Sequence, residues 1–185
     1  WPGPHQVLAR VEAVGLCFSD LKLLKQFSDH ARKSEVLSGV DPAVLPEIPS
    51  YRPGNLPTVP GHEAVCTIVA VGEKVRLYKV GQRVLVETDY RWLPTTKSNA
   101  AFGYNFEGGL QQYVLMDERV IVDPQSGEGF LIPVSDSLSA SAVALVEPWA
   151  CVESSYVDKQ PQTHKTDGKK QVDAESQLDP KKHAN

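Results

Sequence analysis

Two short segments of the chain hold side chains that could bind a metal ion. The segment GLCFSD places the thiol of Cys17 in a glycine turn, and the segment GHE places His62 and Glu63 ahead of an apolar run. A catalytic zinc ion takes thiolate, imidazole and carboxylate ligands at about 2.0–2.3 Å and keeps one position open for water or substrate. These residue types therefore predict a zinc site that contains Cys17 and His62. Either Glu63 or Glu147 would supply a third ligand.

Each of these residues is a weak indication by itself. A lone cysteine is usually a small buried hydrophobic residue, and a lone histidine is more often structural than a metal ligand. A barrel without metal is therefore the competing interpretation. The chain has three cysteines, which are too few for a disulfide framework. We expect Cys66 and Cys151 to be core thiols.

The hydrophobic pattern predicts the strands that would position these segments. Apolar and polar residues alternate over residues 7–14, and Val and Ile are enriched over residues 64–71. Further short strands are expected at residues 82–87, 110–116 and 120–122. Short strands at close spacing, separated by glycine turns, favour a small barrel or sandwich.

Helices and a long connection complete the expected organisation. Ser19 and Asp20 can cap a short helix that runs through Leu24 or beyond. Residues 139–152 are rich in alanine and predict a helix that carries Glu147. The stretch 28–58 holds five prolines and is expected to be an ordered surface loop or insertion.

Composition narrows the class of protein. A formal net charge of −4 gives no general attraction to nucleic acids or anionic membranes, so neither is an expected partner. No apolar run approaches the roughly 18 residues of a membrane helix, and the start at Trp1 carries no recognisable signal peptide. The low cysteine content favours a cytoplasmic location.

The last part of the chain differs in composition from the rest. Residues 158–185 hold six lysines and no aromatic residue. Such a segment has too little apolar surface to offset the entropy lost on ordering. We therefore expect one domain over residues 1–157 and a disordered polar tail over residues 158–185.

Taken together, the motifs resemble the zinc-dependent medium-chain alcohol and polyol dehydrogenase family. That family's zinc signature follows GHE at fixed spacing with positions that are held here by Cys66, Gly72 and Val75, and Cys66 stands where the family has glycine. The opening text PGPHQVLARVEAVGLCFSD and the segments GQRV and GGLQQY resemble further parts of its catalytic domain. The resemblance implies a GroES-like barrel, mainly β with a few helices.

The resemblance also implies a role for each residue of the site. Cys17 and His62 correspond to ligands of the catalytic zinc, and Ser19 corresponds to the hydroxyl that passes the proton of the substrate towards solvent. Asp20 corresponds to the carboxylate that orients the zinc-bound imidazole. Glu63 corresponds to a residue that is a zinc ligand in some branches and a neighbour of the ligating water in others.

Glu147 and Pro148 resemble the Glu-Pro pair of the polyol-type branch. In that branch the glutamate binds the metal, its water or the substrate, whereas alcohol-type relatives carry a cysteine ligand. The resemblance thus implies an oxidoreductase acting on the CH–OH group of a small alcohol or polyol. The competing interpretation is that Glu147 only caps or salt-bridges at a helix break.

Two features of the family have no counterpart in this sequence. Residues 87–106 contain no cysteine, so we expect one catalytic zinc and no structural zinc. The chain also lacks the Gly-x-Gly-x-x-Gly turn of a dinucleotide fold. We therefore expect a truncated or split dehydrogenase, inactive alone, that uses NAD(P) only if a Rossmann domain is supplied. The choice between NAD and NADP stays open.

The sequence leaves other functions open. A non-catalytic GroES-like domain, kept for zinc binding or protein interaction, would share the fold and the two primary ligands. A co-chaperonin-like barrel would share the fold but would have no use for Cys17 beside His62. Ser19, Asp20 and Glu63 favour the dehydrogenase, because a scaffold needs no proton relay. The expected protein partner is a complementing cofactor domain or a second copy of the chain.

Overall fold

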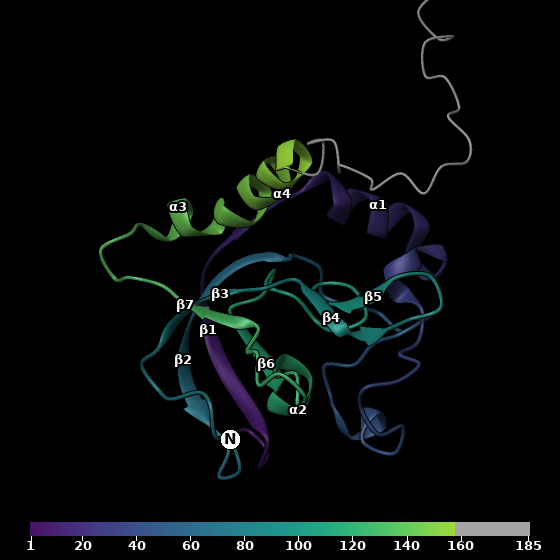
Figure 1. The fold of residues 1–185 in the computed structure, drawn as a ribbon, viewed down its shortest axis with the longest axis horizontal. Helices are drawn as coiled ribbons and strands as arrows, with labels where there is room; N and C mark the ends of the chain where they lie inside the picture. The colour runs from purple at the N-terminus through teal and green to yellow at the C-terminus, as the bar shows by residue number, and fades with distance from the viewer. Residues whose placement is uncertain (158–185) are drawn as a thin grey trace, which may run out of the picture.

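The computed structural model describes residues 1–157 (Figure 1), so the predicted tail at 158–185 lies outside the described residues. Five antiparallel strands form the main sheet in the order β6-β1-β2-β3-β7. They are β1 (Gln6–Gly15), β2 (Glu63–Val71), β3 (Arg83–Val86), β6 (Tyr113–Asp117) and β7 (Leu131–Pro133). The strands predicted from residues 7–14, 64–71 and 82–87 are confirmed within one or two residues.

A second sheet closes the barrel. Strands β4 (Asp89–Pro94) and β5 (Asn99–Ala101) pair with each other and were not expected from the sequence. Their inward side chains join those of the main sheet in one apolar cluster, whose largest fully buried members include Tyr90, Leu93, Phe102, Phe130, Ile68 and Val114. The fold is therefore mainly β with a few helices, as predicted.

Four α-helices lie within residues 1–157: α1 (Phe18–Gln26), α2 (Glu118–Ile121), α3 (Ala140–Ala144) and α4 (Val146–Val157). The strand predicted at 120–122 is wrong, because the Asp117 side chain accepts a hydrogen bond from the Arg119 N–H and caps α2. The helix predicted at 139–152 is divided at Leu145. No helix of the described part has both the length and the apolar character to cross a membrane.

Helix α4 carries Glu147 and lies over one end of the barrel, beside α1 (Figure 1). None of its residues is buried among the described residues. Trp149 and Tyr156 are the most exposed of its large apolar side chains. The helix therefore contacts the barrel without burying a face against it.

The stretch 28–58 is ordered, as expected, and contains short 3-10 helices at Ala31–Lys33 and Leu45–Glu47, with a further one at Phe27–Asp29 on its border. Lys33, near the start of this stretch, is fully buried. Its Nζ donates hydrogen bonds to the carbonyl of Leu56 (2.8 Å), the Oγ1 of Thr58 (2.6 Å) and the carbonyl of Arg52. One buried ammonium thus ties the two ends of this stretch together.

Candidate metal centre

The structure brings three of the predicted site residues together. One ligand atom each from Cys17, His62 and Glu63 lies within 4.8 Å of the other two. Cys17 is the residue before α1, and His62 and Glu63 stand at the start of β2. The thiol is half-buried, whereas His62 and Glu63 are 4% and 5% exposed. Segments 45 residues apart in the chain therefore meet at one end of the sheet.

Two glycines make room for this arrangement. Gly15 pairs with Glu63 across β1 and β2, and a Cβ atom at Gly15 would overlap the Glu63 carboxylate. Gly61 has a φ of +94°, which a residue with a side chain rarely adopts. Sequence reasoning noted both glycines only as parts of motifs and missed that Gly15 provides space for a carboxylate.

Asp20 holds the two ligand segments together. Its Oδ2 accepts a 3.0 Å hydrogen bond from the Cys17 N–H, and its Oδ1 accepts one of 3.0 Å from the Gly61 N–H. Burial alone would raise the pKa of the Asp20 carboxyl, but the interactions with His62, Cys17 and Gly61 outweigh it and hold that pKa below its usual value. The carboxylate is therefore charged at neutral pH although it is 1% exposed.

The imidazole of His62 faces Asp20 through one of its nitrogens. His62 Nδ1 is buried, lies 3.3 Å from Asp20 Oδ1 and has no well-aligned hydrogen bond among the described residues. This placement leaves Nε2 as the nitrogen for a metal. A tetrahedral zinc with bonds of about 2.0–2.3 Å holds its ligands about 3.3–3.8 Å apart. The three donor types are those that zinc prefers, and their spacing of up to 4.8 Å is close to the one that bound zinc requires.

Ser19 lies beside an aromatic residue that the sequence did not point to. The Tyr104 ring is 4% exposed and its centroid lies 5.3 Å from that of His62. Burial raises the pKa of Tyr104 to about 12, and a hydrogen bond with Ser19 opposes this rise. Tyr104 therefore stays neutral at physiological pH and can exchange a hydrogen bond with the Ser19 hydroxyl. Its glycine-rich loop gave no sequence signal for this role.

Glu147 is not in the group of three. It stands in the first turn of α4, half-buried, and its Oε1 accepts a 3.5 Å hydrogen bond from the Cys151 thiol. The prediction that Cys151 is a core thiol is wrong, because α4 leaves this residue exposed. Cys66 is buried as expected, and burial raises the pKa of its thiol to about 12.

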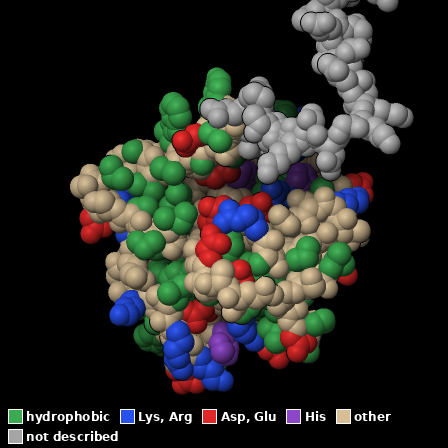
Figure 2. Space-filling view, in the orientation of Figure 1, with side chains coloured by type: hydrophobic (Ala, Val, Ile, Leu, Met, Phe, Trp, Pro, Cys, Tyr) green, Lys and Arg blue, Asp and Glu red, His purple; other side chains and the backbone are tan. Residues whose placement is uncertain are grey.

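A cavity of about 710 Å³ separates α4 from strands β3 and β4. Glu147 and Cys151 line its α4 side, and Thr88 and Asp89 line the opposite side. Thr88 Oγ1 donates a 2.8 Å hydrogen bond to the carbonyl of His62, so this wall is fastened to the metal-site segment. Acidic and basic side chains gather below α4 in Figure 2. Of the predicted site residues, only Glu147 lines this cavity, and the cavity is large enough for a small molecule.

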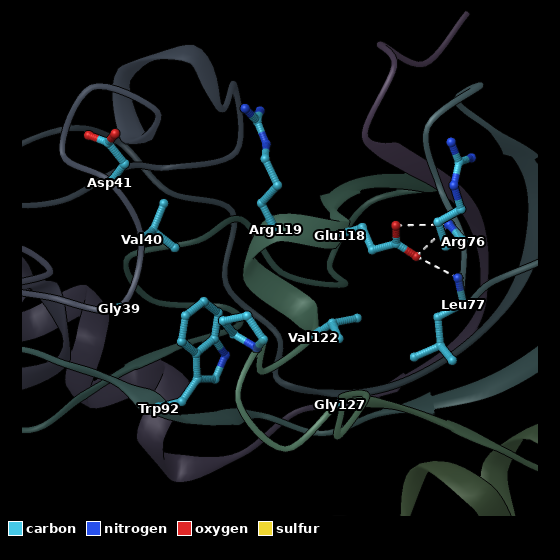
Figure 3. Close-up of a pocket in the computed structure, with 11 residues that line it drawn as sticks. Gly39, Val40, Asp41, Arg76, Leu77, Trp92, Glu118, Arg119, Val122 and Gly127 are labelled. Carbon is cyan, nitrogen blue, oxygen red and sulfur yellow. Dashed lines mark hydrogen bonds between the residues drawn. The ribbon is translucent and has the colours of Figure 1, made fainter.

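A second cavity, of about 520 Å³, contains none of the predicted site residues (Figure 3). Trp92, Leu77 and Val122 give it an apolar floor. The Glu118 carboxylate at its edge accepts hydrogen bonds from the N–H groups of Arg76 and Leu77 (2.9 and 2.7 Å). The Glu118 carboxylate is therefore already engaged by the backbone of Arg76 and Leu77.

The chain shares its fold and sequence pattern with known dehydrogenases. It is 29% identical over 159 residues to D-altritol 5-dehydrogenase of Agrobacterium fabrum, an alignment that covers 80% of this chain and 37% of the relative. It is 30% identical over 154 residues to a zinc-type alcohol dehydrogenase-like protein of Escherichia coli (80% and 38% covered). The crystal structure of 2R,3R-butanediol dehydrogenase from Bacillus subtilis superposes with a TM-score of 0.51 at 29% identity (80% and 38% covered).

The fold and the grouped Cys17, His62 and Glu63 side chains are those of a catalytic domain of zinc-dependent dehydrogenases. Residues 3–125 match the alcohol dehydrogenase GroES-like domain, so the chain belongs to the GroES-like domain family of alcohol dehydrogenases. It spans a little over a third of the length of the curated relatives named above.

Proposed function

We propose that this chain is the zinc-binding part of an NAD(P)-dependent dehydrogenase that oxidises a small alcohol or polyol at a CH–OH group. The observation that carries the proposal is the meeting of Cys17, His62 and Glu63 within 4.8 Å. A thiolate, an imidazole and a carboxylate at this spacing match the ligand preferences of zinc. Glu147 approaches from α4 as the proposed fourth residue of the shell.

The zinc would act as a Lewis acid towards the oxygen of a substrate alcohol. Asp20 holds the Cys17 and Gly61 backbone through its two oxygens, and its Oδ1 lies 3.3 Å from His62 Nδ1, where it would orient the imidazole of a zinc-bound His62. The Ser19 hydroxyl would accept the proton that the alcohol loses while it passes its own proton on towards solvent, and the Tyr104 hydroxyl, which shares a hydrogen bond with Ser19, would orient it. Because Ser19 would release one proton as it takes up another, and Tyr104 stays neutral at physiological pH, no charge would be left on either hydroxyl.

Residues 1–185 do not fit a dinucleotide, because they contain no Gly-x-Gly-x-x-Gly turn. We therefore propose that this chain by itself binds zinc and substrate but does not transfer hydride. The cofactor would be supplied by a complementing domain, in a cytoplasmic setting. The alternative of a non-catalytic zinc-binding domain is less favoured, because a scaffold has no need for Ser19 beside Tyr104.

Zinc content tests the proposal directly. Elemental analysis of the purified chain is expected to give about one zinc per molecule, and Cys17→Ser is expected to lose most of it. Cys66→Ala is the matched control, because its thiol lies in the core cluster away from the group of three. A wild-type protein without zinc after refolding with the metal, or a Cys17→Ser variant that keeps it, would overturn the proposal.

A further inference from the structure

The stretch 28–58 contributes a cation to the cavity beside the metal centre. Arg32, in the 3-10 helix Ala31–Lys33, lines the cavity together with Asp89 of β4. Its Nη1 lies 3.1 Å from Asp89 Oδ1, and both side chains are about one-third exposed (29% and 33%). The ion pair therefore lies at the wall of the cavity rather than in the core.

Arg32 is held in place through both its side chain and its backbone. Its Cζ lies 5.7 Å from the centroid of the Tyr104 ring, the same ring that contacts the His62 imidazole. Its backbone N–H donates a 3.3 Å hydrogen bond to His30 Nδ1. The next residue, Lys33, is buried and anchored by three hydrogen bonds. Arg32 is thus a positioned group and not a freely moving surface side chain.

Arg32 retains hydrogen-bonding capacity for a ligand. Among the described residues, the only side-chain partner of its guanidinium is Asp89, through Nη1. Guanidinium carries five N–H donors, so Nε and Nη2 remain able to donate into the cavity. The Asp89 carboxylate, in turn, keeps free acceptor positions. The pair therefore offers a donor and an acceptor side by side.

The charges around this pair indicate which ligand fits. Asp89 offsets the charge of Arg32, and the carboxylates of Glu87 and Glu147 line the same cavity. An anionic substrate would meet more negative than positive charge here, because Arg91 is already paired with Glu87 and Glu128. Neutral hydroxyl groups, which both donate and accept, match a paired guanidinium and carboxylate.

We propose that Arg32 and Asp89 form a distal subsite that binds the hydroxyl groups of a polyol whose reacting end lies at the metal centre. This inference rests on the proposed function and specifies its substrate class as a neutral polyol longer than a simple diol. Thr88 supports this geometry, because its hydrogen bond to the His62 carbonyl fixes the start of β4 relative to the ligand segment. Arg32 is a specificity-determining residue in this assignment.

The test uses the full chain loaded with cobalt(II) in place of zinc, with the visible cobalt bands as the readout of the metal site. Sorbitol, 2,3-butanediol and gluconate are titrated separately, and saturation-transfer NMR records the same ligands on metal-free protein. The variants are Arg32→Ala, Arg32→Lys and Asp89→Asn. Arg52→Ala is the matched control, since Arg52 lies on the same stretch, pairs with Glu107 and does not line this cavity.

Arg32→Ala and Asp89→Asn are expected to weaken sorbitol binding at least about tenfold, the loss expected for one hydrogen bond to a charged group. Binding of 2,3-butanediol should change less than about twofold, and Arg52→Ala should behave as wild type. Arg32→Lys should bind sorbitol with an affinity between those of Arg32→Ala and wild type, because lysine has a charge but lacks the planar set of N–H donors of a guanidinium.

Equal losses for sorbitol and butanediol, unchanged sorbitol binding or a preference for gluconate would each overturn the subsite. A different result would overturn the proposed function, namely that the cobalt-loaded protein shows no thiolate–cobalt bands. The sorbitol saturation signals on metal-free protein would then still report whether Arg32 contacts the ligand.

Discussion

Asp20 Oδ1 accepts a hydrogen bond from the N–H of Gly61, a residue 41 positions further along the chain. The same carboxylate accepts the N–H of Cys17 through its other oxygen. Two ligand segments from different elements are therefore held by one buried side chain before any metal binds. Such pre-organisation lowers the ordering cost of metal binding.

Replacing Asp20 should therefore affect both stability and metal affinity. Asp20→Asn keeps one acceptor oxygen and loses the other, and should weaken zinc binding by about 10- to 100-fold. It should also cost about 1–3 kcal/mol of unfolding free energy, because a buried N–H loses its partner. Chelator competition and urea unfolding measure the two effects. The exposed Asp41→Asn is the control, and equal behaviour of both variants would contradict the bridging role.

Gly15 should tolerate no side chain as long as Glu63 is present. Gly15→Ala places a Cβ where the Glu63 carboxylate lies, so we expect weaker zinc binding and a loss of about 1–3 kcal/mol, the usual cost of overpacking. In Glu63→Ala the obstructing carboxylate is gone, and adding Gly15→Ala should then cost much less. A double-mutant cycle by urea unfolding gives this coupling. Additive effects would show that the two residues do not compete for the space.

Glu147 should contribute less to metal affinity than Glu63. The structure groups Glu63 with Cys17 and His62 and leaves Glu147 outside that group, so we expect Glu147 to act through a water. Glu147→Gln should lower zinc affinity by about tenfold, a value typical of groups that act on a metal through another ligand, and Glu63→Gln should lower it more. Competition with a chromophoric chelator measures both. The reverse order would make Glu147 the direct ligand.

The buried ammonium of Lys33 predicts a pH effect on stability. Burial, with a smaller contribution from Arg52, lowers the pKa of Lys33 from 10.5 to about 8. Between these values the unfolded chain binds more protons than the folded one, so stability rises with pH across this window and is constant below it. The difference in unfolding free energy between wild type and Lys33→Met should therefore grow from pH 8 to pH 10.

The matched control for this experiment is Lys25→Met, because Lys25 is exposed in the wild-type protein. Urea unfolding at each pH gives the free energies, and titrations elsewhere in the protein cancel in the comparison. Below pH 8 the destabilisation of Lys33→Met should be constant, because it then reflects only the three acceptors that lose their donor, and it should increase from pH 8 to pH 10. A difference that is flat between pH 8 and 10 would mean that the ammonium stays charged in the folded protein.

The sequence predicted those parts of the molecule that local pattern specifies. Period-2 alternation located β1, enrichment in Val and Ile located β2, and the motifs around Cys17 and His62 identified the residues that meet. It failed where tertiary contacts decide. Strand β4 follows no clean alternation because its pairing shifts register between Tyr90 and Pro94, and β5 is only three residues long. Helix α2 forms because the Asp117 side chain caps its start, although Val120 and Ile121 in it are β-branched.

The supporting residues of the site were harder to foresee. Tyr104 and Arg32 lie on segments without regular periodicity, and only the folded chain brings them to His62 and the cavity. The Gly15–Glu63 pairing depends on the register of two strands, which a sequence pattern does not fix. Glu147 was foreseen, as an alternative to Glu63, as a third zinc ligand, but the break at Leu145 sets the direction of the helix that carries it.

Helix α4 buries none of its side chains against the described barrel, and this has a consequence for local opening. Its amide hydrogens should exchange with solvent through small fluctuations, while those of β1 and β2 exchange only when the barrel unfolds. Glu147 and the α4 wall of the cavity then sample a range of positions. A ligand that fixes this wall loses some binding free energy, because α4 gives up conformational entropy when it becomes ordered. The ligand should slow amide hydrogen exchange along α4 in proportion to its affinity.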